Sequence, residues 1–352
     1  MEPRVGVVGI GWSGFSTTTP GVSYKELMFG AARSAYADAG IDPRSEIDSF
    51  VCASEDFEEG TSIFDEYVPD QLGAVQRPVQ TVASDGLFAI ATAVMLIRSG
   101  IARMVAVEAH SKASDVVSHG RIERFALDPV LNRPLGVPAL AVAGLEMRRY
   151  LHESGRTAKG CADVATRNRE HAATNARAAY AEVTDAAVLF DPLTSDQAAQ
   201  STDGCVVVVL AAEHRGRHAA VWIDGIGWSQ DAPSLESRRW GEAVAARRAG
   251  EMAYRQAEVE PGDVDLAEVD DTFAYKQLQH LDALGLQELD PSRVNRSGGA
   301  LGEGHLHEAN GLARLLACVE QLRVGEGRIA VVQSWRGVPS SSAAAAVMRG
   351  AG

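Results

Sequence analysis

The chain has 352 residues, of which 46% are hydrophobic and 23% are charged, and its net charge is −14. This composition is typical of a globular protein with one large domain or two medium ones. The acidic balance argues against a broad surface for nucleic acids or anionic membranes, which require a basic face. The N-terminus lacks the features of a signal peptide, no apolar run is long enough to cross a membrane, and the four cysteines show no C-x-x-C spacing. We therefore expect a cytoplasmic protein without a membrane span, disulfides or a zinc site.

The first predicted element is an apolar strand that ends in the sequence GIGWSG. Its residues Gly9, Gly11 and Gly14 match the pattern G-x-G-x-x-G, which is typical of dinucleotide-binding sites. Such a site requires a helix to open at the glycines, so that the pyrophosphate meets the helix N-terminus. Here the next helix start is predicted only at Ser23, which forms a capping-box pattern with Glu26. We therefore interpret the glycines as a turn after a strand, and a nicotinamide-dependent enzyme stays as an alternative.

The sequence GIGWS occurs a second time at residues 225–229. Each copy is followed by an amphipathic helix, a turn with proline and an apolar strand, and the two copies align at an offset of 218 residues. A second pair of segments, 86–109 and 311–334, aligns without a gap at an offset of 225 residues. Each segment of this pair predicts an apolar helix, a turn with glycine and a buried strand. Because both helices are apolar on nearly all sides, we expect them to lie between two sheets.

The chain is therefore predicted to contain two copies of one α/β unit. We place the first half at residues 1–215 and the second half at 216–352. The first half contains an insertion at about residues 110–200, which has no counterpart in the second half. A repeat of this length indicates a duplicated half-domain, because solenoid repeats are much shorter.

Five segments of the chain carry a resemblance to a known family. They are RVGVVGIGWSGF, VATRNREHAATN, STDGCVVVVLAAE, DLAEVDDTFAYKQLQHLDALGL and NRSGGALGEGHLHEANGLARL. Over essentially its whole length the chain resembles the thiolase superfamily, and in particular the sterol-carrier-protein type of thiolase. The resemblance implies an α/β fold of five layers, α-β-α-β-α, with two pseudo-symmetric halves. It also implies a homodimer, or a heterodimer with another thiolase-like chain.

The resemblance implies two cysteine positions, and neither holds a cysteine here. The nucleophile of thiolases lies three residues before the glycine of the first buried helix, which is the place of Ala83, and the second cysteine falls on Trp335. Alanine forms no thioester and tryptophan does not titrate, so thiolysis through a covalent acyl-enzyme is disfavoured. Ser84 stands next to Ala83 and is either a catalytic residue or, as we favour, the N-cap of the helix. An acyl-CoA thiolase or acyltransferase stays as an alternative.

The Gly-His loop of the family falls on His305. In relatives this histidine holds a thioester oxygen as it becomes an enolate, and a donor close to a helix N-terminus suits that task. The alternative is a histidine that only satisfies its own loop. His307 and Glu308 follow, and at the offset of 225 residues Glu308 corresponds to Ala83. Both are candidate acids or bases, with capping of the first helical turn as the alternative for Glu308.

The third motif of the family falls on the sequence DDTFAY, which begins at Asp270. Two adjacent acids shift the pKa of one of them upward, so Asp271 is a candidate acid or base. Tyr275 is a candidate for handling a substrate hydroxyl, because tyrosine acts as an acid or base in catalysis. The alternative for Tyr275 is an aromatic ring packed on the following helix.

These candidates fit the retro-aldol cleavage of a β-hydroxyacyl-CoA. A base removes the β-hydroxyl proton, the Cα–Cβ bond breaks, and the thioester enolate is held until it is protonated. The chain resembles bacterial steroid side-chain aldolases, which implies a steroid CoA ester as substrate and a small partner protein with an OB-fold and a zinc ribbon. A non-catalytic thiolase-like subunit of an acyl-CoA-processing complex is the competing hypothesis.

A CoA ester requires basic contacts for its phosphates. Arg238, Arg239 and Arg247 are the candidates, in the segment that leads into the first helix of the second half. The alternative is a solvated charged face. We expect no metal and no cofactor other than the CoA that the substrate carries.

Overall fold

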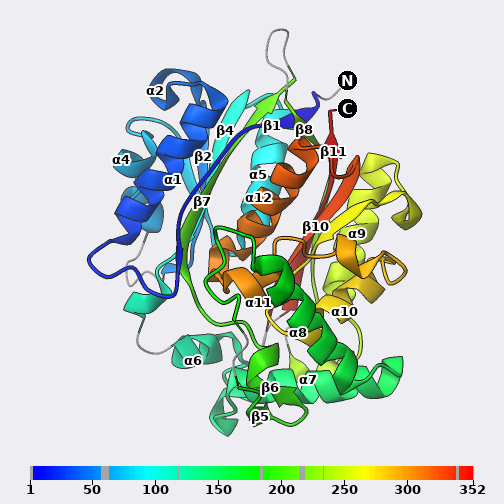
Figure 1. Ribbon diagram of the computed structural model, residues 1–352. Coiled ribbons are helices and arrows are strands. Elements are labelled where there is room, and N and C mark those ends of the chain that lie inside the picture. Colours follow the sequence, from blue (N-terminus) through cyan, green and yellow to red (C-terminus); the bar gives the residue numbers. More distant parts are fainter. Residues whose placement is uncertain are drawn as a thin grey trace.

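The computed structural model describes residues 3–56, 63–116, 119–182, 185–213, 219–232, 234–337 and 341–351. Two layers of strands enclose a central pair of helices, and further helices cover the outer faces of both strand layers (Figure 1). The central helices are α5 (Gly86–Arg98) and α12 (Asn310–Arg323). This arrangement has the five layers that the sequence predicts.

The first half supplies one strand layer and its outer helices. Its strands are β1 (Val5–Ser16), β2 (Ser49–Ala53), β3 (Val79–Val82), β4 (Met104–Ser111) and β7 (Asp203–Ala212). Its outer helices are α1 (Tyr24–Ala39), α2 (Pro43–Glu46) and α4 (Pro69–Leu72). Helix α1 begins after Ser23, whose side chain forms a capping box with Glu26, so the predicted helix start is confirmed.

The second half supplies the other strand layer. Its strands are β8 (Val221–Gln230), β9 (Leu266–Glu268), β10 (Ile329–Gly337) and β11 (Ser341–Gly350). Its further helices are α9 (Val244–Ala257), α10 (Ala274–Ala283) and α11 (Gly299–Glu303). The strand order β2-β4-β7-β1 in the first half is repeated as β9-β10-β11-β8 in the second. This repetition is what two copies of one unit produce.

The two strand layers are joined into one sheet of nine strands, in the order β3-β2-β4-β7-β1-β8-β11-β10-β9. The junction is a short antiparallel pairing of β1 with β8, in which Val5 faces Ile223 and Val7 faces Val221. The sequence predicts two sheets over a shared helical layer. The pairing links them because the first strand of each half lies at the inner edge of its layer.

The repeated GIGWS sequences allow an outer helix to pack closely on the first strand of each half. A Cβ atom at Gly11 would lie 2.3 Å from the carbonyl oxygen of Ala31 in α1, and one at Gly227 would lie 2.3 Å from that of Ala249 in α9. Strand β1 continues through the glycine pattern to Ser16, and no helix opens there. The glycines therefore serve helix–strand packing in both halves.

The central helices are buried on nearly all sides, as their apolar sequence predicts. Their side chains form one core cluster with strands of both halves. The helices approach each other closely at their starts, where a Cβ atom at Gly86 would lie 2.5 Å from Cγ of Leu312. This close approach brings both helix N-termini to the same region of the molecule.

The insertion lies beyond one end of the strand layers (Figure 1). Its elements are α6 (His119–Ile122), α7 (Ala139–Ser154), α8 (Ala158–Ala172), β5 (Val188–Phe190) and β6 (Leu193–Thr194). Helix α8 packs against α10 and α11 of the second half. Within the described ranges, no helix has the length and apolar character needed to cross a membrane.

Candidate functional site

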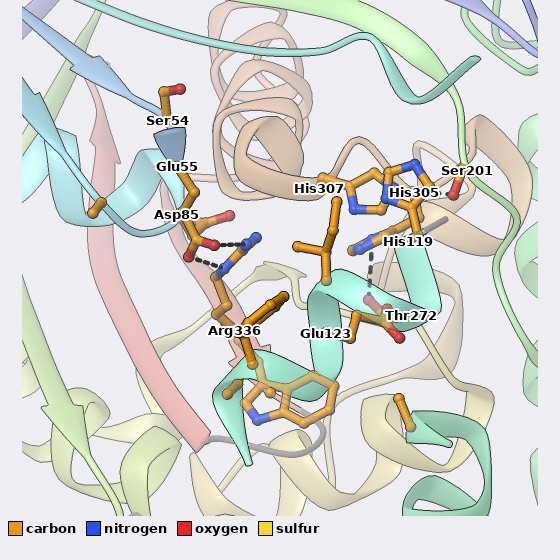
Figure 2. Close-up of a pocket in the computed structure, with 18 of the residues that line it drawn as sticks. Ser54, Glu55, Asp85, His119, Glu123, Ser201, Thr272, His305, His307 and Arg336 are labelled. Atoms are coloured by element: carbon orange, nitrogen blue, oxygen red, sulfur yellow. Dashed lines mark hydrogen bonds and ion pairs between the residues drawn. The ribbon is translucent and has the colours of Figure 1, made fainter. Parts of the chain in front are cut away.

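A cavity of about 860 Å³ lies where the starts of the central helices meet the insertion. Both halves and the insertion line it, among them Ala83, Asp85, His119, Thr272, His305 and Arg336. Figure 2 shows two groups of side chains on its wall. We call His119, His305 and His307 the histidine side, and Glu55, Asp85 and Arg336 the carboxylate side. Ala83 and His305 therefore open onto one cavity, as the sequence predicts.

His305 is fixed by its backbone at the cavity wall. It lies in the turn after α11, where its N–H donates to the carbonyl of Gln200 at 2.8 Å and its carbonyl accepts from the N–H of Thr202 at 3.0 Å. Its ring nitrogen Nδ1 lies 3.3 Å from the hydroxyl of Thr272. Thr272 also lines the cavity. The predicted oxyanion donor thus points into the cavity from a rigid loop.

His307 lies between the other two histidines. Its ring stacks on that of His119 at 4.4 Å and 14° between ring planes, and its centroid lies 4.8 Å from that of His305. Its Nε2 lies 3.0 Å from the hydroxyl of Ser201. Burial lowers the pKa of His307 well below its usual value, and the nearby His305, His119 and Arg336 lower it further. His307 is therefore a neutral ring at physiological pH.

The predicted acid Glu308 is held by an arginine. It lies in the 3₁₀ turn His307–Ala309 that leads into α12, and it is buried. Arg336 pairs with Glu308 at 2.6 Å and with Glu55 at 3.0 Å. Arg336 and Glu55 line the cavity, whereas Glu308 lies behind them. This position makes Glu308 a counter-ion of Arg336.

Asp85 connects the starts of both central helices. Its carboxylate accepts from the N–H of Leu87 in α5 and from the N–H of Gly311 in α12, both at 2.8 Å. Burial raises its pKa to about 6. Asp85 is the N-cap of α5, so the sequence-based assignment of the cap to Ser84 is wrong. Ser84 lines a separate cavity of about 430 Å³ that shares Glu55, Ala83 and Arg336 with the first.

The predicted acid/base residues Asp271 and Tyr275 do not line the cavity. The Asp271 carboxylate accepts from the N–H groups of Ala300 and Leu301 at the start of α11, and burial raises its pKa to about 7. The Tyr275 hydroxyl donates to Glu146 at 2.8 Å, and burial raises its pKa well above the usual value. Both side chains are used in packing, which corrects the prediction that they handle substrate.

The three arginines predicted for CoA lie away from the cavity. Arg239 pairs with Glu242 at 3.2 Å and Arg247 pairs with Glu251 at 3.1 Å, both on the surface. Arg238 donates to the carbonyl of Ala232. The described cavity wall instead carries five carboxylates and one arginine, namely Glu55, Asp56, Asp65, Asp85, Glu123 and Arg336. The cavity interior is therefore unsuited to a phosphate, and the solvated-face alternative fits Arg239 and Arg247.

None of the four cysteines lines the cavity. Cys52, Cys161, Cys205 and Cys318 are all buried in strands or helices. Trp335, at the predicted position of the second cysteine, does line it, and the Nζ atom of Lys276 lies 4.1 Å from its ring centroid. In the described part of the chain, no group of three or more His, Cys, Asp or Glu side chains is arranged to hold a metal ion.

Several cavity residues were not candidates from the sequence. His119 and Glu123 come from the insertion, where their spacing of four residues puts both on one face of a helical turn. That spacing was the available signal, but the sequence offers no link between this segment and His305. Asp85 was missed because Ser84 is an equally good capping residue by type.

Comparisons with known proteins agree with this architecture. Residues 227–290 match the family model described as "Thiolase C-terminal domain-like". The acetyl-CoA acetyltransferase of Methanothermobacter thermautotrophicus is 25% identical, and the match covers 92% of each chain. The steroid side-chain-cleaving aldolase of Thermomonospora curvata is 27% identical over 95% of this chain and 96% of that protein. Bovine sterol carrier protein 2 is also 27% identical, over 93% of this chain and 68% of that protein.

Solved structures show the same fold. The Ltp2-ChsH2(DUF35) aldolase superposes with a TM-score of 0.82 at 23% identity, covering 99% of this chain and 98% of that one. Human mitochondrial 3-ketoacyl-CoA thiolase superposes with a TM-score of 0.80 at 18% identity, covering 99% of both chains. With the duplicated sheet, the paired central helices and the relatives in sequence, the chain belongs to the thiolase superfamily and is similar to its sterol-carrier-protein type.

Proposed function

We propose that the chain cleaves the Cα–Cβ bond of a β-hydroxyacyl-CoA by a retro-aldol reaction. The observation that carries the proposal is a cavity that holds His305 at its wall and is lined by none of the four cysteines. A thiolase reaction requires a nucleophile where Ala83 stands. A retro-aldol reaction requires none, and the similarity to the aldolase of Thermomonospora curvata supports this class of chemistry.

The reaction proceeds in two chemical steps. A base takes the proton of the β-hydroxyl, the oxygen electrons form a carbonyl, and the electrons of the Cα–Cβ bond pass into the thioester. An aldehyde or ketone and a thioester enolate result. Protonation of Cα then gives a shorter acyl-CoA. Protons and electrons balance without an oxidant, a reductant or a covalent enzyme intermediate.

His305 is the proposed donor to the enolate oxygen. Its backbone hydrogen bonds hold the ring in place before substrate enters, and such preorganised donors contribute about 100-fold to 1,000-fold in rate. The side of the cavity that carries His305 also has the Thr272 hydroxyl, which fixes the orientation of the ring. The negative charge that develops on the thioester oxygen is stabilised there.

The charge of the cavity wall limits which part of the substrate enters. Five carboxylates and one arginine, already paired with Glu55 and Glu308, repel the phosphates of CoA. We infer that the acyl end enters the cavity and the nucleotide stays outside. A second chain supplies basic contacts to the nucleotide in this proposal, either a second thiolase-like chain or a small partner with an OB-fold. A steroid acyl group remains the substrate that the relatives suggest.

The test uses 3-hydroxy-3-methylbutyryl-CoA and longer β-hydroxyacyl-CoA esters, incubated with the purified chain alone and with co-purifying partners. We expect mass spectrometry to detect the shortened CoA ester and the matching carbonyl compound. His305→Ala is expected to lose about 100-fold or more in rate, and the exposed Arg247→Gln is the control. The proposal fails if no ester is cleaved in any preparation, or if His305→Ala cleaves as fast as the unchanged chain.

A further inference from the structure

The short helix α6 and the turn that follows it carry two titratable side chains to the cavity. His119 begins α6, and Glu123 begins the 3₁₀ turn Glu123–Ala126. Both line the cavity, and Figure 2 shows them near His305 and Thr272. The proposed retro-aldol reaction needs a base for the β-hydroxyl proton, and the residues considered above supply none inside the cavity.

A backbone carbonyl sets the tautomer of His119. Its Nε2 lies 3.3 Å from the carbonyl oxygen of Ala113. A carbonyl oxygen only accepts hydrogen bonds, so Nε2 carries the proton and donates. In the neutral ring the lone pair is then on Nδ1. A neutral imidazole with a defined lone pair is the form that acts as a general base.

Stacking holds the His119 ring beside the proposed enolate donor. The ring lies nearly parallel to that of His307 at 4.4 Å, and the centroids of His307 and His305 are 4.8 Å apart. The β-oxygen and the thioester oxygen of a β-hydroxy thioester are separated by three carbon atoms. Two polar groups on one wall can therefore contact both oxygens of a single substrate.

The other titratable groups of the wall are engaged elsewhere. Asp85 accepts from two helix N–H groups, and Glu55 pairs with Arg336. The pKa of His307 is held well below its usual value by burial, and its Nε2 faces the Ser201 hydroxyl. His119 is the remaining histidine whose defined lone pair and place on the wall suit a base.

We propose that His119 is the catalytic base that removes the β-hydroxyl proton, and that Glu123, one helical turn later, stabilises the imidazolium that results. This assignment rests on the retro-aldol function proposed above. His119 acts on the β-oxygen, whereas His305 acts on the thioester oxygen. The two roles can be separated, because forming a thioester enolate from an acyl-CoA requires His305 but no base for a β-hydroxyl.

Two measurements on the same samples test the assignment. The first is cleavage of 3-hydroxy-3-methylbutyryl-CoA to acetone and acetyl-CoA. The second is exchange of the Cα protons of acetyl-CoA in D₂O, which reports enolate formation alone. We expect His119→Gln to lower cleavage by about 100-fold or more while exchange stays within about two-fold. Arg121→Gln, on the same helix but outside the cavity lining, is expected to change neither.

Further variants protect the test against misfolding. His119→Ala is expected to regain cleavage when imidazole is added, which a folding defect would not allow. Glu123→Gln is expected to lower cleavage by about ten-fold and to shift the limb of its pH profile that reports the base toward lower pH, because the imidazolium loses a stabilising charge. The assignment is overturned if His119→Gln cleaves normally, or if cleavage and exchange fall together. If the unchanged chain shows neither cleavage nor exchange, the proposed function itself fails and the assignment fails with it.

Discussion

The starts of α5 and α12 occupy corresponding places in the two halves but carry different chemistry. At the start of α5, Asp85 accepts from the N–H groups of both central helices. At the start of α12 the corresponding residue is Asn310, which donates to the buried Asp270 at 2.5 Å. One half thus supplies a carboxylate to both helix N-termini, and the other supplies an amide that points away from them.

This difference moves the proposed chemistry within the cavity. Helix N-termini stabilise negative charge, and in this chain Asp85 already occupies that position for both central helices. Glu308, the counterpart of Ala83, is neutralised by Arg336. The carboxylate side is therefore satisfied internally, and the proposed reaction takes place on the histidine side, which the second half and the insertion build together.

Glycine substitutions at the two helix starts test the comparison with the largest expected effect. A Cβ atom at Gly311 would lie 2.0 Å from Oδ1 of Asp85, whereas one at Gly86 would meet Cγ of Leu312 at 2.5 Å. We expect Gly311→Ala to lower the free energy of unfolding by about 3 kcal/mol, because it displaces a buried carboxylate from its donors. Gly86→Ala is expected to cost about 1 kcal/mol, since a leucine side chain can change rotamer.

Chemical denaturation of both variants and the unchanged chain measures these values. Gly100→Ala serves as a control for loss of a glycine, because the space around its Cβ position is open, although its φ of +76° adds some backbone strain. Equal effects of Gly311→Ala and Gly86→Ala would contradict the view that Asp85 ties the two helices together.

The central helices show how much of this architecture can be predicted from sequence. Their all-round apolarity predicts burial between two layers, and the repeated glycines predict a shared unit, because both signals lie within short segments. The same holds for the start of α1 at Ser23. Local patterns of this kind are read directly from neighbouring residues.

The histidine side could be predicted only in part. His305 was identified through its motif, but its stacking partners depend on how the insertion folds back over the helix starts. His119 lies far from His305 in the sequence, and no spacing rule connects the two. Asp85 likewise acquires its role from Gly311, a contact between the two halves that no local pattern contains.

Replacement of Asp85 tests the same helix starts through pH. Its pKa of about 6 lies above the ordinary value of 3.8, so the native chain holds this proton more tightly than the unfolded chain. As pH rises from about 4 to about 6, the unfolded carboxyl ionises first and the free energy of unfolding falls, with a slope of up to about 1 kcal/mol per pH unit. Above that window the contribution is constant.

Asp85→Asn is expected to remove this slope and to lower the free energy of unfolding by about 2 kcal/mol at neutral pH, because an amide cannot accept from both helices. Denaturation curves at several pH values measure both effects. Asp128→Asn is the control, because Asp128 is exposed and its pKa is lowered by the N–H groups of Leu131 and Val130. A pH slope in Asp85→Asn equal to that of the unchanged chain would show that Asp85 is ionised throughout.

The smallest expected effect concerns Ser84, which stands between the former nucleophile position and the true cap. Its neighbour Asp85 caps α5, so Ser84→Ala is expected to change the free energy of unfolding by less than about 0.5 kcal/mol. Cleavage of β-hydroxyacyl-CoA esters is expected to stay within about two-fold, because the proposed reaction needs no serine nucleophile. Asp85→Ala provides the contrast, since loss of a cap costs about 1 kcal/mol or more. If Ser84→Ala abolished cleavage while leaving stability unchanged, a serine would be forming an acyl-enzyme, and the start of α5 would have kept the nucleophilic role that its counterpart in α12 lacks.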